Sequence, residues 1–256
     1  MLALVVALAA VVLGGCSGDK GTGKAEAPEG PGPKPEFTDF CVRGLETETY
    51  PEPGVDLSKL SEPEQVQVVK AYASGLVAQA ERLREVAPEQ IRTDVNVVVD
   101  AMVRVRETGD LKVLDEDKVV TAHRRVHTFE LDNCGWARQD VTAVDYGYRG
   151  VSPSVAGGPT SFELKNEGAE AHELVLVKIN DNVKDSLDQL LSRPRDELGV
   201  RVTNVGSASA KPGEQSFVVA DLSRGRYAMV CFLPVDGVSD GPPHFSRGMQ
   251  AEFRVA

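Results

Sequence analysis

The sequence predicts an α+β chain in which a small helical bundle is followed by an all-β sandwich. From Phe37 to Trp136, apolar residues recur every three or four positions, which is the period of amphipathic helices. After Val141 the period changes to two, and seven or so short β segments follow within about 115 residues, separated by Gly, Pro and Asn. This length and number of strands are typical of a β-sandwich. We therefore expect two domains, a helical bundle over 37–136 and a β-sandwich over 138–256.

Three amphipathic helices are expected in the first domain. Ser61, with a glutamate three residues later, forms a capping box that starts the first helix, and Pro88 ends it. The second helix carries an apolar stripe over 91–105 and stops near Gly109, and Asp115 is expected to cap the third. Three such helices joined by short breaks predict a small antiparallel bundle.

The second domain is expected to consist of short strands with one helical interruption. Alternating apolar residues predict strands over 141–150, 161–166, 172–179, 199–205, 215–220, 227–233 and 250–255. Residues 183–192 have leucines on one side and predict a helical flap against the sandwich.

The N-terminus has the pattern of an export signal. Residues 1–16 are apolar and end in small residues and a cysteine, and they are too short to span a bilayer. The letters LGGC, ending at Cys16, resemble the bacterial lipobox, and this resemblance implies that Cys16 carries lipid and anchors the protein to the outer face of the cell membrane. No Lys or Arg precedes the apolar run, so we expect the true start to lie upstream. Residues 17–36 are rich in Gly, Pro, Lys and Glu and predict a disordered tether.

The acidic composition bears on the partners. The chain has 39 acidic and 28 basic residues and a net charge of −11. Such a surface repels phosphate backbones, so we expect no nucleic-acid partner. The partners expected are the membrane, through the lipid anchor, and an unidentified redox or envelope protein.

The cysteines of the first domain predict a disulfide. Cys41 and Cys134 flank the expected bundle, and in an oxidising compartment such a pair is most simply a bridge. The layout resembles a helical domain of actinobacterial envelope lipoproteins, a resemblance that implies the same bridge and location. His123 and His127 share a helix face, but no third ligand is evident, and a solvated basic face is the expected alternative to a metal site.

A second group of residues has the pattern of a metal site. Asn166-x-Gly168 precedes His172 at the start of an expected strand, Cys231 ends another strand, and His244 and Met249 follow. Two histidines, a cysteine and a methionine are the ligand set of a blue copper centre. The alternative is a satisfied core histidine, an inert buried thiol and a core methionine, which explains each residue singly but not their joint placement.

Residues 138–256 resemble the cupredoxin family of the plastocyanin and azurin type. The resemblance implies a Greek-key sandwich with one copper ion, Cu(I) or Cu(II), held by His172, Cys231 and His244, with Met249 as a weak axial ligand. Two features depart from the family: twelve residues separate Cys231 from His244, and Glu173 stands where better-known members have Asn. The longer loop costs only about 1 kcal/mol of closure entropy, and Glu173 is expected either to alter the surroundings of the ligands or to compete as one.

The expected function is single-electron transfer by a membrane-anchored, extracytoplasmic copper protein, with His244 as a surface-exposed electron port. The alternatives are a metal-free binding module of the envelope and a protein for copper capture or delivery. An enzyme is not expected, because the sequence has no nucleophile elbow, no zinc-protease motif and no His-x-His pairs for a second copper cluster.

Overall fold

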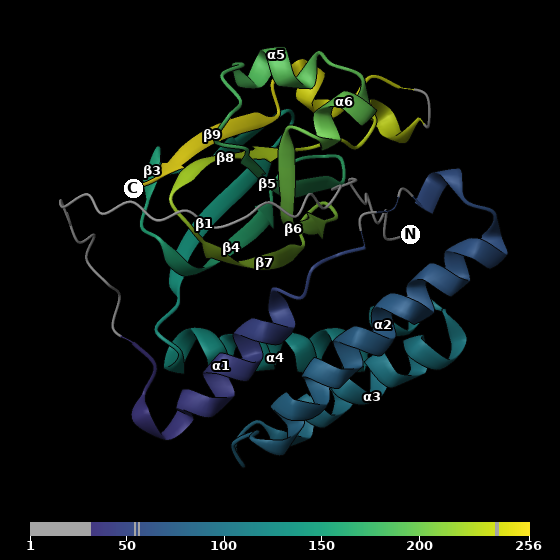
Figure 1. Cartoon of the computed structure of the whole chain (residues 1–256), viewed down its shortest axis with the longest axis vertical. Helices are drawn as coiled ribbons and strands as arrows, with labels where there is room; N and C mark the ends of the chain where they lie inside the picture. The colour runs from purple at the N-terminus through teal and green to yellow at the C-terminus, as the bar shows by residue number, and fades with distance from the viewer. Residues whose placement is uncertain (1–31, 54, 56, 239–240) are drawn as a thin grey trace.

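The computed structural model describes residues 32–53, 55, 57–238 and 241–256. Cys16, the expected signal segment and most of the expected tether lie outside this part of the chain. A helical region lies against one side of a two-sheet region, and two short helices cover the opposite side (Figure 1). Among the described residues, no helix is long and apolar enough to cross a bilayer.

Four α-helices form the N-terminal half. They are α1 (Thr38–Glu48), α2 (Glu62–Glu85), α3 (Arg92–Thr108) and α4 (Asp117–Asn133), with 3-10 turns at Pro35–Phe37, Leu57–Lys59 and Leu111–Asp115. The capping box of Ser61 is present, and Gly109 ends α3 in the left-handed conformation. The cap of α4 is Glu116 rather than Asp115, because Asp115 completes the 3-10 turn before it. Helix α1 was not expected from the sequence.

Two mixed sheets form the C-terminal half. The first has the order β2-β1-β4-β7, with β1 (Ala137–Val144), β2 (Gly147–Arg149), β4 (Gly158–Asn166) and β7 (Gln215–Leu222). The second has the order β3-β9-β8-β5-β6, with β3 (Ser154–Val155), β5 (His172–Ile179), β6 (Val202–Ala210), β8 (Gly225–Val230) and β9 (Gln250–Val255). Strand β1 runs parallel to β4, and β3 runs parallel to β9.

Three sequence expectations need correction here. The expected strand over 141–150 is two strands, β1 and β2, which pair with each other through a tight turn. The expected strand over 199–205 begins only at Val202, since α6 (Arg195–Gly199) occupies the residues before it. The flap helix is shorter than expected, because α5 spans only Leu187–Leu191.

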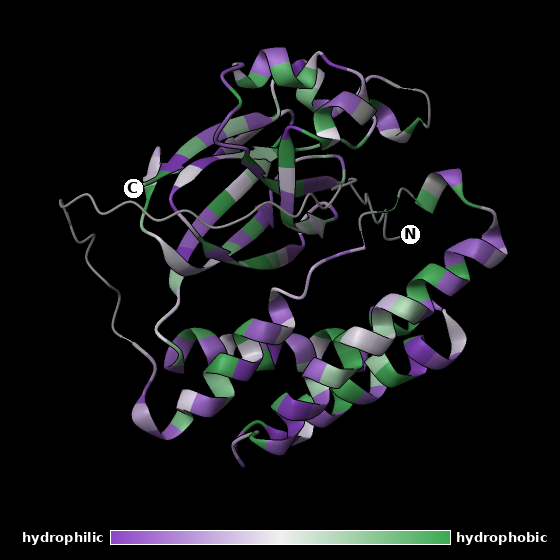
Figure 2. Cartoon of the chain, in the orientation of Figure 1, coloured by the Kyte–Doolittle hydropathy of each residue, from purple (hydrophilic) through white to green (hydrophobic). Residues whose placement is uncertain are grey.

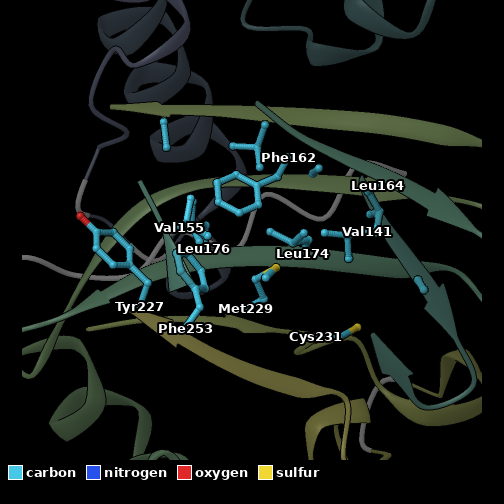
Figure 3. Close-up of a cluster of buried hydrophobic side chains, with 14 of the residues drawn as sticks. Val141, Val155, Phe162, Leu164, Leu174, Leu176, Tyr227, Met229, Cys231 and Phe253 are labelled. Atoms are coloured by element: carbon cyan, nitrogen blue, oxygen red, sulfur yellow. The ribbon is translucent and has the colours of Figure 1, made fainter. Parts of the chain in front are cut away.

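The core of the sandwich lies between the two sheets. Hydrophilic and hydrophobic residues alternate along the strands (Figure 2), so that one side of each strand faces this core. Phe162 and Leu164 from the first sheet meet Leu174, Met229 and Phe253 from the second. Tyr227 lies at one end of this cluster and Cys231 at the other (Figure 3). The apolar core therefore ends at Cys231, where polar side chains begin.

The helical half is cross-linked and docked on the first sheet. Cys41 and Cys134 form a disulfide, which confirms the predicted bridge. The cluster around this bridge contains Trp136 and also takes in Phe217 and Val219 of β7. The helices and the sheets thus share apolar contacts, although the exact division into two domains stays a prediction.

Candidate metal centre

Three of the four predicted ligands meet at one end of the sandwich. His172 begins β5, Cys231 directly follows β8, and His244 begins a 3-10 turn (His244–Arg247) just before β9. Because β5 and β8 are antiparallel neighbours, the start of one lies beside the end of the other. Within the part of the chain that is described, these residues form the one group of at least three His, Cys, Asp or Glu side chains whose candidate ligand atoms all lie within 4.8 Å of one another.

The donor atoms of the three side chains face one another. The Nδ1 atoms of His172 and His244 are 3.1 Å apart, and the Sγ atom of Cys231 is 3.3 Å from Nδ1 of His244. His172 and Cys231 are fully buried, and His244 is 1 % exposed. Two ring nitrogens and a thiol thus converge in a place closed to bulk water.

Met249 lies beside this group. Its side chain is fully buried and belongs to the same apolar cluster as Cys231. Its backbone carbonyl accepts a hydrogen bond from the amide of Cys231 at 3.2 Å, and its own amide donates to the carbonyl of His244 at 3.2 Å. Met249 is therefore tied to two of the converging residues, and its role as an axial ligand stays a prediction.

The loop between Cys231 and His244 is closed at its base. Pro234 and Pro243 form an antiparallel bridge. The amide of His244 donates to the carbonyl of Leu233 at 2.8 Å, and the amide of Phe245 donates to the carbonyl of Cys231 at 3.0 Å. The pairing at the base brings the two ends of the loop together, so that the loop's length does not separate the two donors.

Burial controls the ionisation of the thiol and of one imidazole. It raises the pKa of Cys231 to about 12, partly offset by the backbone amide of Glu173, which donates to the sulfur at 3.5 Å. Burial, together with the neighbouring His172, lowers the pKa of His244. At neutral pH the thiol therefore holds its proton until a cation displaces it, and His244 is available as a neutral donor.

The outer nitrogens of both histidines contact carboxylates. Nε2 of His172 is 2.6 Å from Oδ1 of Asp145, and Nε2 of His244 is 3.2 Å from Oε2 of Glu170. The ring of Tyr146 packs edge-on against His244, with ring centroids 4.8 Å apart, and its hydroxyl donates to Glu170. Sequence reasoning missed Asp145, Tyr146 and Glu170. The available signal was their position in the turn after β1 and in the segment before β5, at the same end of the sandwich as the candidate ligands.

Two expectations about this end of the molecule change. The prediction that His244 is surface-exposed is wrong, since Tyr146 and Glu170 lie against the ring and leave it 1 % exposed. The carboxylate of Glu173 is outside the converging group and accepts a hydrogen bond from the amide of Phe232 at 2.9 Å. The structure therefore places Glu173 beside the candidate ligands and not among the converging donor atoms.

His123 and His127 lie away from this centre. His127 is 2 % exposed, stacks on Phe217 with ring centroids 3.5 Å apart, and contacts Oε1 of Glu163 at 2.7 Å. His123 contacts Oε1 of Glu48 at 3.1 Å. The expectation of a solvated face is therefore wrong for His127, which lies between the bundle and the first sheet.

Comparisons with solved structures return cupredoxins at low identity over about half of the chain. Auracyanin B is 19% identical, with 47% of this chain and 88% of that chain covered and a TM-score of 0.32. An auracyanin from Roseiflexus castenholzii is also 19% identical, with 47% and 97% covered and a TM-score of 0.32. Auracyanin A of Chloroflexus aurantiacus, described as a blue copper protein, is 16% identical, with 47% and 100% covered and a TM-score of 0.29. Searches against protein-family models and against curated proteins found no match.

Proposed function

We propose that this chain binds one copper ion through His172, Cys231 and His244, with Met249 as a weak axial ligand, and carries single electrons. The observation that supports this most is the convergence of one ring nitrogen from each histidine and one thiol within 4.8 Å of one another in a buried place. A pair of imidazoles with a thiolate suits copper, and a thioether completes the set used by one-electron copper sites. Bound there, copper would supply a one-electron couple between its monovalent and divalent states.

The surrounding residues are suited to hold such an ion in one geometry. The paired base of the loop fixes the spacing between Cys231 and His244. The amide of Glu173 points its hydrogen at the sulfur of Cys231 and stabilises negative charge on that atom. Burial excludes water as an additional ligand, so that little rearrangement is needed when the charge of the ion changes by one.

We also propose that the protein works outside the cytoplasm, held at the membrane by lipid on Cys16. The LGGC pattern supports the anchor, and the Cys41–Cys134 disulfide supports an oxidising compartment. The partner in electron transfer would be a redox or envelope protein at the same surface. The proposal includes no enzymatic reaction and no nucleic acid.

Copper titration of the purified protein tests the proposal. We expect one equivalent of Cu(II) to bind and to produce an intense visible band from charge transfer between the thiolate sulfur and copper. Cys231→Ala should abolish the band, and His244→Ala should weaken binding. Met249→Leu should keep the ion and raise the reduction potential, because a weak axial ligand is lost. His123→Ala, which removes a histidine outside the centre, is the control and should behave as wild type.

Two other functions are outcomes of the same experiment. Absence of copper uptake by the folded protein would favour a metal-free binding module of the envelope. Uptake with rapid loss of the ion to a competing chelator would favour copper capture or delivery, whereas slow loss is expected from a centre whose histidine rings are almost fully buried.

A further inference from the structure

Asp145 and Glu170 occupy equivalent positions on the two histidines of the centre. Asp145 comes from the turn between β1 and β2, and Glu170 lies in the segment just before β5. Each places one oxygen at Nε2 of a different histidine, at 2.6 Å for His172 and 3.2 Å for His244. Both ring edges that face away from the converging donors are therefore occupied by carboxylates.

Both carboxylates are themselves held in place. The amide of Ala169 donates to Oδ2 of Asp145 at 2.8 Å. The hydroxyl of Tyr146 donates to Oε1 of Glu170, and the amide of Asp236 donates to Oε2 at 2.7 Å. These donors hold the acceptor oxygens at the histidine rings, whereas a solvated carboxylate would sample many rotamers.

Gly168 gives independent support for a close-packed Asp145–His172 pair. A Cβ atom at this position would lie 2.3 Å from Oδ1 of Asp145 and 2.5 Å from Nε2 of His172, both shorter than real Cβ contacts. Its amide donates to Oδ1 of Asn166 at 2.8 Å, which sets the turn. The Asn-x-Gly turn therefore leaves room for the aspartate on the histidine.

A carboxylate at Nε2 determines which ring nitrogen is available to a metal. It accepts a hydrogen from Nε2, so that the lone pair remains on Nδ1. In this protein the two Nδ1 atoms lie 3.1 Å apart and also face the sulfur of Cys231. Lone pairs that converge in this way repel one another unless a cation or a proton lies between them.

We infer that Asp145 and Glu170 are positioning residues that direct both Nδ1 atoms at the metal and make the centre favour a divalent over a monovalent ion. The inference rests on the proposed copper function. Two negative charges, each one imidazole ring away from the ion, stabilise the higher charge more than the lower. They therefore raise Cu(II) affinity more than Cu(I) affinity and lower the reduction potential.

The test separates charge from hydrogen bonding. Asp145→Asn and Glu170→Gln keep an acceptor oxygen and the size of the side chain but remove the charge, whereas Asp145→Ala removes both. Affinities for Co(II), Cu(II) and Cu(I) are measured by competition with chromogenic chelators, and the folded state by thermal melting. The control is Glu163→Gln, which neutralises the carboxylate on His127, a histidine outside the centre.

Each amide variant should lose about 10-fold to 100-fold in Co(II) and Cu(II) affinity, with a smaller loss for Cu(I). If Cu(I) affinity is unchanged, this loss corresponds to a rise of about 60 to 120 mV in reduction potential. Asp145→Ala should lose more divalent affinity than Asp145→Asn, and Glu163→Gln should change none of the three affinities.

Equal losses for Cu(II) and Cu(I), or an equal loss in Glu163→Gln, would overturn the inference while leaving the copper site intact. A folded wild-type protein that binds none of the three ions would overturn both the inference and the proposed function. If one of the two amide variants does not fold, the other one, which changes the carboxylate at the second histidine, provides the same test.

Discussion

Glu130 lies on α4 with its side chain fully buried, packed so closely against Gly44 of α1 that a Cβ atom there would be 2.2 Å from Oε1. Neither carboxylate oxygen has a hydrogen-bond partner among the described residues. Burial, together with the negative charge of Glu48, raises the pKa of Glu130 well above its ordinary value of 4.5. The folded protein therefore keeps a proton on Glu130 that the unfolded chain releases.

This difference in proton binding gives a pH-dependent stability. Between pH 4.5 and the raised pKa of Glu130, the free energy of unfolding should fall as the pH rises, by about 1.4 kcal/mol per pH unit for this one group. Glu130→Gln removes the titration, so it should match wild type at pH 4 and be more stable at pH 7. Denaturant unfolding at several pH values measures the difference.

An exposed glutamate on α1 provides the control. Glu46 is exposed and pairs with Arg43 on its own helix, so Glu46→Gln is the matched substitution that removes a carboxylate without changing a buried side chain. If the free energies of unfolding of Glu130→Gln and wild type differ by the same amount at every pH between pH 4 and pH 7, Glu130 is not buried in its uncharged form and the prediction is wrong.

For single residues, the sequence predicted which side chains come together at the centre but not which residues from distant segments cover them. The convergence of His172, Cys231 and His244 could be predicted, because the residue types and their order along the chain are visible in the sequence. The burial of His244 could not, since it depends on Tyr146 and Glu170, which approach the ring only after β1 and β5 have taken their places in different sheets. An exposed acidic residue and a carboxylate bonded to a buried imidazole look alike in a sequence.

The same contrast holds for the helices and strands. The boundaries predicted from local chemistry, such as the capping box at Ser61 and the glycine at Gly109, agree with the structure because they depend on a few neighbouring residues. Strand β3 has two residues and exists only by pairing with β9, about 100 residues later. Such short elements carry too little periodicity to be recognised before their partner is known.

The disulfide gives a prediction for the helical half. It joins residues 93 apart, from α1 to the end of α4, and therefore restricts most of the bundle in the unfolded chain. In the chain-entropy model such a loop contributes about 4 to 5 kcal/mol to the free energy of unfolding. The double variant Cys41→Ala/Cys134→Ala should lose stability of this order. Fluorescence of Trp136, the one tryptophan and a neighbour of the bridge in the core, reports the transition.

Reduction of the wild-type protein is the companion experiment. Reduction should lower the free energy of unfolding by a similar amount, and it leaves no cavities because both sulfur atoms remain. The comparison therefore separates the entropy of loop closure from the loss of packing in the alanine variant. If neither the double variant nor reduction changes the midpoint of denaturant unfolding, the bundle must keep its shape in the unfolded ensemble, contrary to the prediction.

At the scale of the whole molecule, the bundle and the sandwich are joined by polar and aromatic contacts as well as apolar ones. His127 of α4 contacts Glu163 of β4 and stacks on Phe217 of β7. Arg124 donates to the backbone carbonyl of Gln215 at 2.9 Å. These contacts lie on the first sheet, whereas His172 begins a strand of the second sheet and Cys231 directly follows another strand of it, so that the contacts named here and these two candidate ligands are carried by different sheets.

This separation predicts that docking can be weakened without damage to the centre. Phe217→Ala removes the ring that contacts both His123 and His127 and should destabilise the protein by about 3 kcal/mol, the lower end of the range for a buried phenylalanine because Phe217 is only partly buried. Backbone amides of α1 and α4 should exchange hydrogen faster in this variant, and its copper affinity should equal that of wild type. Val42→Ala, at a residue of α1 that is 46% exposed, is the control and should change neither the rate of amide exchange nor the copper affinity. A loss of copper affinity in Phe217→Ala that matches its loss of stability would instead mean that the bundle and the metal centre form one cooperative unit, since the sandwich could then not hold its ligands unless the helices were docked.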